Sequence, residues 1–534
     1  MMTPAKIESL KAFGILIGNF DGVHLGHQSL IDNFIKTCGE RKITPVLYTF
    51  SPHPYHFFHD SKSPFIILDN NKKYLKLKEV GIKNVYEIEF DENLQKMSPE
   101  EFINKYLLSN SNLKLVYLGH DFRLGKGKID SRELIRTMTK NMDIEIIESK
   151  SFKLNDQIVS SSAIRKLIKE GNDFDLIEKF LGERYIIDGT IVKGAGLGST
   201  KLVPTINIDP ITGLIYPSAG VYISEIEIQG QVYPSVTNIG IKPTVSNAEI
   251  VNIETHLLYN NILIENKIIK INLFRKIRAE IKFSSISLLK EQIEKDINQA
   301  KNYFRLRSNV KLGLIGKNIA HSQSQQIYEE LLEKAVDYTL FDVEENELPD
   351  LKTIMKSGFL GISITSPYKN KYLKDISIVN EADTSINVIK FEKNKFIATN
   401  TDRLAISEIL DRYIKQKIGK IIILGNGAMA TIVEEEARKR ISHIVLLSRQ
   451  NESLDSLEKI VINENKNTLI VNCCSRSYNL PNISDIDLNI WDLNYDHTHN
   501  ANTFNNSRAN YIDGVEMLRL QAKYALSFWN LSKD

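Results

Sequence analysis

One ten-residue stretch decides how the first part of the chain is interpreted: Gly18-Asn19-Phe20-Asp21-Gly22-Val23-His24-Leu25-Gly26-His27. The apolar run Phe13–Ile17 before it predicts a buried strand, and apolar residues at helical spacing after it predict an amphipathic helix over 25–37. Two histidines therefore stand at a helix start, where free backbone N–H groups and the helix dipole attract anions. The stretch predicts a site that binds the phosphates of a nucleotide.

A plainer interpretation competes with this one, because loop histidines are often only solvated or cap a helix. Gly-Asn and Asp-Gly are also ordinary turn dipeptides. The ten-residue pattern, with its strand before and helix after, is more specific than His-x-Gly-His alone. It resembles the nucleotidyltransferases of the HxGH type. In particular, it resembles the adenylyltransferase half of bacterial bifunctional riboflavin kinase/FAD synthetases.

Length and composition limit the classes of protein. The 534 residues predict three or four domains, and 42% hydrophobic with 25% charged residues is ordinary for globular proteins. A net charge of +2, with both signs mixed along the chain, gives no electrostatic basis for nucleic-acid binding. No apolar run has the length of a signal peptide or membrane span. We expect a cytoplasmic enzyme that acts on small molecules; the sequence makes no prediction of oligomeric state.

The spacing of the three cysteines, Cys38, Cys473 and Cys474, is typical neither of a disulfide framework nor of a metal site.

The order of predicted elements gives an α/β multidomain fold. Residues 1–180 alternate strands and helices and predict a parallel sheet. Residues 183–305 hold short strands between turn residues, which predict a small antiparallel barrel, followed by a helix over 286–304. Alternation restarts at 311 and predicts an α/β lobe over 311–415 and a Rossmann lobe over 416–534, with a returning C-terminal helix.

Three further motifs in 1–180 match the adenylyltransferase family: Thr49-Phe50-Ser51-Pro52-His53-Pro54, Gly119-His120-Asp121-Phe122-Arg123-Leu124-Gly125 and Val159-Ser160-Ser161-Ser162-Ala163-Ile164-Arg165. Each alone could be a turn or a helix cap. The resemblance implies that FMN and ATP give FAD and pyrophosphate, with Mg²⁺ accompanying ATP. It also implies catalytic roles for His24, His27 and Arg165. Substrate contacts are implied for Gly18, Phe20, Asp21, Gly22, Asp121, Ser161 and Ser162.

Residues 183–305 resemble the riboflavin kinase half of the same family. Gly189-Thr190-Ile191-Val192-Lys193-Gly194-Ala195-Gly196-Leu197-Gly198 could surround phosphates or be a flexible turn. By resemblance, Gly194 contacts phosphate, Thr205 and Asn207 bind ATP and Mg²⁺, and Glu254 is the base. Polar and apolar residues alternate over 251–257, so Glu254 shares a face with polar neighbours. Ser199 to Val203 replace the family's Arg-x-Leu-Gly-Phe, yet the retained Thr205 and Asn207 predict an active kinase.

Residues 311–534 resemble shikimate dehydrogenase, which implies reduction of 3-dehydroshikimate with NADP(H). The implied catalytic pair is Lys369 and Asp402, because a reduced ketone needs a proton donor beside the hydride donor. The strand–turn–helix pattern Gly425-Asn426-Gly427-Ala428-Met429-Ala430 is a dinucleotide fingerprint. Arg449, after the next strand, favours the extra phosphate of NADP. The implied substrate and cofactor contacts are Ser322, Ser324, Thr365, Asn387, Gly425, Gly427, Arg449 and Gln521.

Several supporting residues of that family are replaced, namely at Gln325, Ser363, Val388, Ala398 and Ala405, and 497–510 lacks the usual motif. The retained catalytic pair favours activity, on the family's substrate or a related one. The alternative is a nucleotide-binding or interaction module without catalysis. For the first domain, the alternative is adenylylation of a different phosphorylated small molecule, against which the following kinase-like barrel argues.

Overall fold

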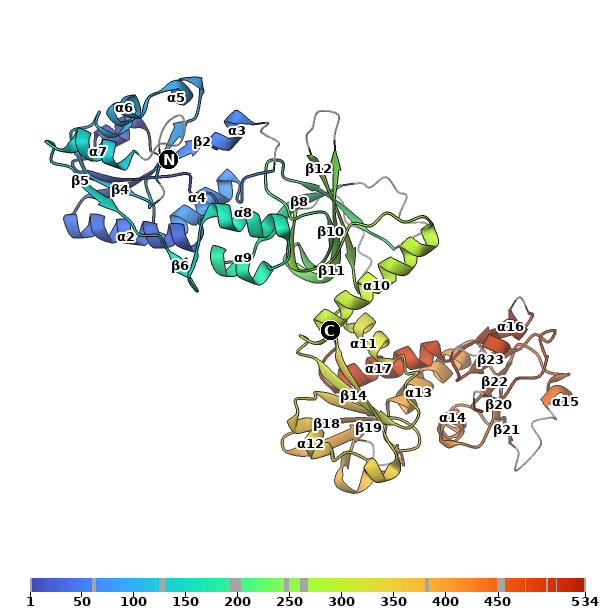
Figure 1. Ribbon diagram of the computed structural model, residues 1–534. Helices are drawn as coiled ribbons and strands as arrows, with labels where there is room; N and C mark the ends of the chain where they lie inside the picture. The colour runs from blue at the N-terminus through green and yellow to red at the C-terminus, as the bar shows by residue number, and fades with distance from the viewer. Residues whose placement is uncertain are drawn as a thin grey trace. The chain divides into compact units, whose positions relative to one another are not determined.

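The computed structural model describes residues 2–59, 64–120, 122–123, 131–192, 203–243, 249–259, 268–379, 384–448, 457–475, 477–495, 498–505 and 507–532. The chain divides into two compact units, Met1–Lys301 and Asn302–Asp534 (Figure 1). Within these described ranges, no helix is both long and apolar enough to span a membrane. Each unit is built around its own sheets and is described separately below.

The first unit begins with a five-stranded parallel sheet of order β3-β2-β1-β4-β5. The predicted parallel α/β fold is therefore confirmed. The strand order reverses between β1 and β4, and ligands of such sheets bind in the crevice at this point. The helix α2 (Leu25–Arg41) begins directly after the loop that leaves β1. The strands are β1 (Phe13–Ile17), β2 (Thr44–Ser51), β3 (Val85–Glu89), β4 (Leu113–Leu118) and β5 (Glu145–Glu148).

A closed six-stranded barrel of order β10-β11-β12-β9-β8-β13 follows, as predicted. The strand β9 (Ile206–Pro210) was not predicted, because it is short, closely follows Pro204 and ends at Pro210, and prolines are more typical of a loop. One hydrophobic core joins the barrel interior to α8 (Ser161–Glu170), α9 (Phe174–Leu181) and Ile67, whereas the five-stranded sheet packs in separate cores. The other barrel strands are β8 (Ile186–Val192), β10 (Gly220–Ile228), β11 (Gln231–Pro243), β12 (Glu249–Leu257) and β13 (Ile268–Ala279), and α10 (Ile286–Arg305) follows them.

The second unit holds two sheets. A mixed six-stranded sheet has the order β15-β14-β16-β18-β19-β17, and a parallel five-stranded sheet has the order β21-β20-β22-β23-β24. This agrees with the predicted α/β lobe and Rossmann lobe. The strands are β14 (Lys311–Gly316), β15 (Asp337–Asp342), β16 (Gly361–Ile364), β17 (Ser377–Ile378), β18 (Val388–Glu392), β19 (Lys395–Thr399), β20 (Lys420–Leu424), β21 (Ile444–Leu447), β22 (Thr468–Asn472), β23 (Asn489–Asp492) and β24 (Asn510–Ile512).

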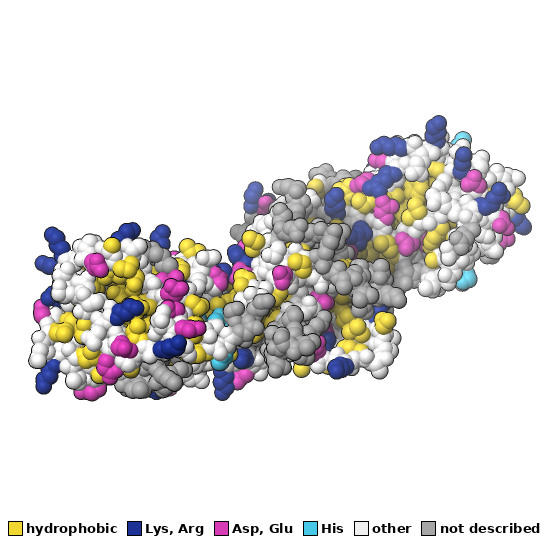
Figure 2. Space-filling model, turned by 90° about the horizontal axis from the view of Figure 1, so that it is seen from above, with side chains coloured by type: hydrophobic (Ala, Val, Ile, Leu, Met, Phe, Trp, Pro, Cys, Tyr) yellow, Lys and Arg dark blue, Asp and Glu magenta, His cyan; other side chains and the backbone are white. Residues whose placement is uncertain are grey.

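Three helices join these two sheets. The helix α13 (Thr401–Lys415) packs against both α14 (Ala428–Arg438) and α17 (Val515–Phe528). The helix α17 also packs against α11 (Ser324–Leu332) beside the mixed sheet, so the end of the chain returns to the first lobe. On the molecular face in Figure 2, Lys and Arg side chains are interspersed with Asp and Glu. This mixing agrees with the net charge of +2.

The close contact between Gly361 and Trp529 gives a stability prediction. A Cβ at position 361 would lie 2.3 Å from the Trp529 ring, whereas a Cβ at Gly419 would meet nothing within 4 Å. We expect Gly361→Ala to destabilise the second unit by about 2 kcal/mol through overpacking, and Gly419→Ala to leave it near the wild-type value. Trp491 and Trp529 are the 2 tryptophans of the chain, so urea unfolding followed by tryptophan fluorescence reports this unit. Equal midpoints for the two variants would contradict the prediction.

Candidate active sites

His24 and His27 lie together at the start of α2. The Nδ1 atom of His24 accepts a hydrogen bond from the backbone N–H of His27 at 3.2 Å, so His24 caps the helix. The two rings stack with their centroids 3.7 Å apart and a tilt of 17°. Because Nδ1 of His24 accepts, the proton of the neutral ring resides on Nε2. His24 is therefore set to donate from Nε2.

Both imidazoles are held neutral by their surroundings. Burial, and then the positive charges of Arg165 and Lys76, lower the pKa of His24 from 6.5 to about 3. Burial, with His24 and Arg165, lowers the pKa of His27 well below its ordinary value. Among the described residues, the Nδ1 atom of His27 is buried without a hydrogen-bond partner. The site offers N–H hydrogen bonds from neutral rings, while Arg165 carries the positive charge.

Asp21 is occupied by the protein itself. Its side chain is 3% exposed, and its Oδ2 accepts from Nη2 of Arg165 at 2.6 Å. Its Oδ1 accepts from the backbone N–H groups of Ile67 and Leu68 at 2.9 and 3.3 Å. Ser161 donates from Oγ to the backbone carbonyl of Asp21 at 2.9 Å. The structure thus places Asp21 and Ser161, both predicted to contact substrate, in the scaffold of the loop after β1.

Arg165 keeps donors for a ligand after these contacts. Its Nε donates to the backbone carbonyl of Phe65 at 3.0 Å, and the guanidinium lies 3.9 Å from the Phe65 ring centroid. Together with the bond to Asp21, this contact uses two of the five N–H donors of Arg165.

The other predicted residues lie around the starts of α2 and α8. A Cβ at Gly26 would lie 2.8 Å from the carbonyl oxygen of Val159, so the start of α2 approaches the start of α8 closely. Phe20, predicted at the site, is buried with its ring centroid 5.2 Å from that of His27. Of the other predicted contacts, Gly18 and Gly22 lie in the loop between β1 and His24, and Ser162 is exposed on the first turn of α8.

The barrel brings three polar residues to adjacent strands. Asn207 on β9 lies opposite Glu254 on β12, which lies opposite Asn238 on β11. Directly opposed residues of antiparallel strands have Cβ atoms about 5 Å apart. Asn252 donates from Nδ2 to Oε1 of Glu254 at 2.9 Å, and the buried and half-buried residues of β12 alternate as expected. Thr205 is exposed immediately before β9. The strand register therefore places Asn207 and Glu254 side by side.

A cavity of about 220 Å³ in the second unit gathers seven predicted residues. In its lining, Nζ of Lys369 donates to Oδ2 of Asp402 at 2.6 Å, and the Met429 sulfur lies 3.9 Å from the same nitrogen. Met429 is on the first turn of α14, so the Rossmann lobe reaches the pair. Ser363, which occupies a position where shikimate dehydrogenases usually have Asn, also lines the cavity. The seven residues are Ser322, Ser324, Thr365, Lys369, Asn387, Asp402 and Gln521.

Asp402 is positioned by hydrogen bonds at the start of α13. The backbone N–H of Thr401 donates to Oδ1 of Asn387 at 2.7 Å, and Nδ2 of Asn387 donates to Oγ1 of Thr401 at 2.9 Å. Thr401 also donates to Oε1 of Gln521 at 3.4 Å. Asn387 and Gln521, expected to contact substrate, thus also fix the turn that carries Asp402.

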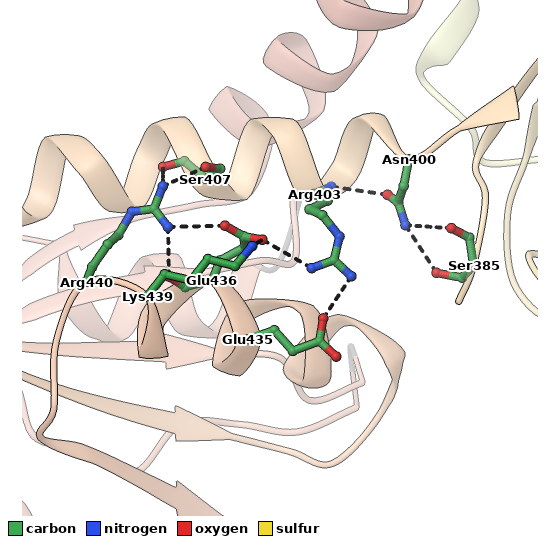
Figure 3. Close-up of polar contacts among 8 residues, drawn as sticks. All are labelled: Ser385, Asn400, Arg403, Ser407, Glu435, Glu436, Lys439 and Arg440. Atoms are coloured by element: carbon green, nitrogen blue, oxygen red, sulfur yellow. Dashed lines mark hydrogen bonds and ion pairs between the residues drawn. The ribbon is translucent and has the colours of Figure 1, made fainter. Parts of the chain in front are cut away.

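A charged cluster joins α13 to α14 (Figure 3). Arg403, directly after Asp402, pairs with Glu435 at 2.8 Å and with the 3% exposed Glu436 at 3.1 Å. Glu436 also accepts from Lys439 and Arg440 at 2.6 and 3.1 Å. This cluster holds the helix that carries Asp402 against the helix that begins at the dinucleotide fingerprint. Gly425 precedes that helix, and a Cβ at its N-cap Gly427 would meet nothing within 4 Å, so its N-terminus is open.

Family models match three consecutive ranges: FAD synthetase over residues 6–163, riboflavin kinase over 181–304 and shikimate dehydrogenase substrate binding domain over 314–389. A bifunctional riboflavin kinase/FMN adenylyltransferase from Buchnera aphidicola subsp. Schizaphis graminum is 35% identical over 306 residues, 56% of this chain and 96% of that protein. The protein of the same name from Bacillus subtilis is 35% identical over 293 residues, 54% of this chain and 91% of its own. The chain belongs to the bifunctional riboflavin kinase/FMN adenylyltransferase family.

This membership rests on the first part of the chain. The second unit resembles shikimate dehydrogenase through the match over 314–389. A solved chorismate mutase/shikimate 5-dehydrogenase fusion protein from Clostridium acetobutylicum is 22% identical, with a TM-score of 0.37, and covers 42% of this chain and 93% of its own. A likeness this weak carries no argument about activity. The chain therefore covers nearly the full length of these riboflavin kinase/FMN adenylyltransferases and continues with a unit that resembles shikimate dehydrogenase.

The sequence analysis did not identify two lysines that lie near His24 and Asp21. Lys73 on α4 (Asn70–Glu79) is 5% exposed, and its Nζ lies 3.5 Å from Oγ1 of Thr49 at the end of β2. Burial lowers the pKa of Lys73, while Glu87 and Asp21 raise it. Lys76, one turn further on, pairs with Glu183 at 2.6 Å and lowers the pKa of His24. In a chain with 68 Lys and Arg residues, no sequence pattern distinguished the buried Lys73 or the partly buried Lys76 from the others.

Three predicted site residues, Asp121, Gly194 and Arg449, lie outside the described residues. The same holds for residues 193–198 of the glycine-rich stretch and for Ser199 and Leu202, which follow it. Their roles stay predictions from the sequence.

The lowered pKa of His24 predicts a pH dependence of stability. The folded-state value of about 3 lies below the ordinary value of 6.5, so below pH 6.5 the unfolded chain gains a proton that the folded one does not. The resulting stability is complete above pH 6.5 and is lost progressively as the pH falls. At pH 5 the loss from this one residue is about 2 kcal/mol.

The matched variant is His24→Asn, because asparagine keeps an N-cap acceptor but does not titrate. Urea unfolding of both proteins is followed by far-UV circular dichroism at pH 7 and at pH 5. We expect the free energy of unfolding of the first unit to fall by about 2 kcal/mol less in the variant than in the wild type between these two pH values. Tryptophan fluorescence should show the same transition of the second unit in both proteins. Equal losses for the first unit would contradict the prediction.

Proposed function

We propose that the first 305 residues phosphorylate riboflavin to FMN and then adenylylate FMN to FAD, with ATP as co-substrate in both steps. The observation that carries this proposal is the stacked His24–His27 pair at the start of α2, beside the Arg165 guanidinium. Family membership supports the same pair of reactions. The barrel, which places Asn207 opposite Glu254, belongs to the same compact unit.

In the adenylylation step, an FMN phosphate oxygen attacks the α-phosphorus of ATP. A P–O bond forms to FMN, the bond to the β-phosphate oxygen breaks, and pyrophosphate leaves. The nucleophile is already an anion, so the protein needs to position two anions and stabilise developing charge. We assign the N–H groups of His24 and His27 and the remaining donors of Arg165 to the phosphates. Neutral imidazoles suit this role, because they bind phosphate oxygens without proton transfer.

In the kinase step, a ribityl hydroxyl of riboflavin attacks the γ-phosphorus of ATP, and ADP leaves. An alcohol nucleophile must lose its proton, and Glu254 can accept it. The Thr205 hydroxyl and Asn207 amide are oxygen donors of the kind that Mg²⁺ prefers, and Asn207 lies opposite a carboxylate, so these residues fit the ion. Thr205 and Asn207 would hold Mg²⁺, which neutralises phosphate charge when bound.

Separate assays of the two steps test this proposal. Purified protein with Mg-ATP is given riboflavin or FMN, and FMN and FAD are quantified by chromatography. We expect Glu254→Gln to lower FMN formation at least about 100-fold, because the amide cannot accept the proton, and to leave FMN adenylylation within about 2-fold. Wild-type protein that leaves riboflavin unphosphorylated would overturn the kinase assignment. FMN left unchanged while another phosphorylated small molecule is adenylylated would favour the alternative substrate.

For the second unit, the Lys369–Asp402 pair in its cavity favours a second function. We propose NADP(H)-dependent reduction of 3-dehydroshikimate to shikimate, or of a related hydroxylated ring carboxylate. Lys369 donates a proton from Nζ to the carbonyl oxygen, and Asp402 holds that nitrogen at 2.6 Å. The open N-terminus of α14 fits a pyrophosphate, so Gly425 and Gly427 would hold the dinucleotide and Arg449 its extra phosphate. The cofactor supplies the hydride when bound.

Lys369→Met gives the test of this second function. Methionine keeps the length and apolar stem of lysine but cannot donate a proton. We expect shikimate-dependent reduction of NADP⁺, followed by absorbance, to fall at least about 100-fold, while NADPH binding by fluorescence titration stays within about 3-fold of wild type. No turnover by the wild-type protein, with NADPH binding retained, would favour the alternative of a nucleotide-binding module.

A further inference from the structure

The segment 65–68 is bonded to the barrel on one edge. The backbone N–H groups of Phe65 and Ile66 donate to the carbonyl oxygen of Gly213, both at 3.1 Å. The N–H of Ile215 donates to the carbonyl oxygen of Ile66 at 2.8 Å, and Ile66 and Leu214 form a parallel bridge. Gly213, Leu214 and Ile215 belong to the connection between β9 and β10, so a barrel turn pairs with a segment of the first domain.

On its other edge, the same segment holds the charged groups of the adenylylation site. The N–H of Ile67 binds the Asp21 carboxylate at 2.9 Å, and the carbonyl of Phe65 binds Arg165 at 3.0 Å. The Asp21 and Arg165 side chains are only 3% and 14% exposed and pair at 2.6 Å. Displacing the segment would leave a buried carboxylate and a buried guanidinium with fewer partners. Leaving these charges without partners would cost free energy, so the positions of Asp21 and Arg165 depend on the position of residues 65–68.

Packing reinforces this connection. Ile67, Leu214 and Ile215 belong to one hydrophobic core, which also contains Ile164 and Ile168 of α8. The turn and the helix that carries Arg165 therefore belong to the same core. Gly213 has φ = +82°, a conformation that glycine adopts freely and that β-branched residues strongly disfavour.

We propose that the barrel turn Gly213–Ile215 is a positioning element of the adenylylation site, acting through residues 65–68 on Asp21 and Arg165. The turn touches no reacting group, and this inference rests on the proposed FMN adenylylation. The strand β9, which carries Asn207 of the kinase site, ends three residues before Gly213. One connection of the barrel thus leads from the kinase strand to the adenylylation site, and adenylylation depends on a segment outside its own domain.

Two substitutions at position 213 separate backbone conformation from side-chain volume. Gly213→Val disfavours the positive φ, whereas asparagine tolerates the left-handed region. We expect the valine variant to lower kcat/KM for FAD formation from FMN at least about 10-fold, because small misplacement of positioned groups has large rate effects. Riboflavin phosphorylation should stay within about 2-fold, and Gly213→Asn should restore adenylylation to within about 3-fold of wild type.

Asp188→Asn is the matched control for general loosening. Asp188 on β8 pairs with Lys72 on α4, a second contact between barrel and first domain that does not involve residues 65–68. We expect both activities of this variant to stay within about 2-fold of wild type. If it lowers adenylylation as much as Gly213→Val does, then general docking rather than the turn is responsible and the inference is overturned.

Kinase activity serves as the internal check of barrel folding. If Gly213→Val loses both activities, Leu214→Ala decides: adenylylation lowered at least about 5-fold with the kinase intact supports the inference, and unchanged adenylylation overturns it. A valine variant with wild-type adenylylation overturns it as well. Wild-type protein that makes no FAD from FMN would instead overturn the proposed function, so the two failures are distinguished in the same assay.

Discussion

The buried ion pair between Asp21 and Arg165 is the constraint on which the first unit depends. Two charges with so little exposure are tolerated only when both are paired and hydrogen-bonded. Those partners come from different parts of the chain: the loop after β1, residues 65–68 and the start of α8. The pair thereby fixes three segments relative to one another, and the stacked histidines lie beside the loop that it anchors.

The same physical requirement shapes the second unit. Lys369 and Asp402 pair inside the cavity, and the residue after Asp402 is Arg403, which pairs with Glu435 and Glu436 on α14. The start of α13 thus carries two adjacent charged residues, each with partners from a different element. Asp402 and Arg403 connect Lys369 to Glu435 and Glu436 on α14. The charged contacts of both residues thus fix the start of α13 next to the cavity.

The electrostatics of the histidine site also follow from burial. A histidine in a solvated loop would titrate near neutrality, and its charge would suit phosphate binding. Here burial and the neighbouring cations keep both rings neutral, so the positive charge is concentrated on Arg165 and the nearby lysines. The two histidine rings are therefore neutral hydrogen-bonding groups that lie beside a fixed cation.

The sequence alone determined the local elements and the chemistry-bearing motifs. Phe13–Ile17 and the strand before Gly425 are apolar runs bounded by glycine turns, and such signals are local, so both strands were predicted with their motifs. The pairing of Lys369 with Asp402 followed from the family resemblance, and the cavity gathers them as expected. The barrel was predicted from short strands and turns, although β9 was not, because five residues that closely follow one proline and end at another carry too little strand signal.

Tertiary structure alone decided which of the polar groups in these motifs are bonded to other parts of the protein. Asp21 and Ser161 looked like substrate contacts in their motifs, but their partners lie 46 and 140 residues away in the chain. Lys73 was one lysine among many until it was found buried beside Thr49. The bond between Gly213 and residues 65–66 joins two domains through backbone atoms, which no side-chain pattern records. Burial and long-range backbone pairing depend on the whole fold, whereas a sequence motif encodes only local conformation and side-chain chemistry.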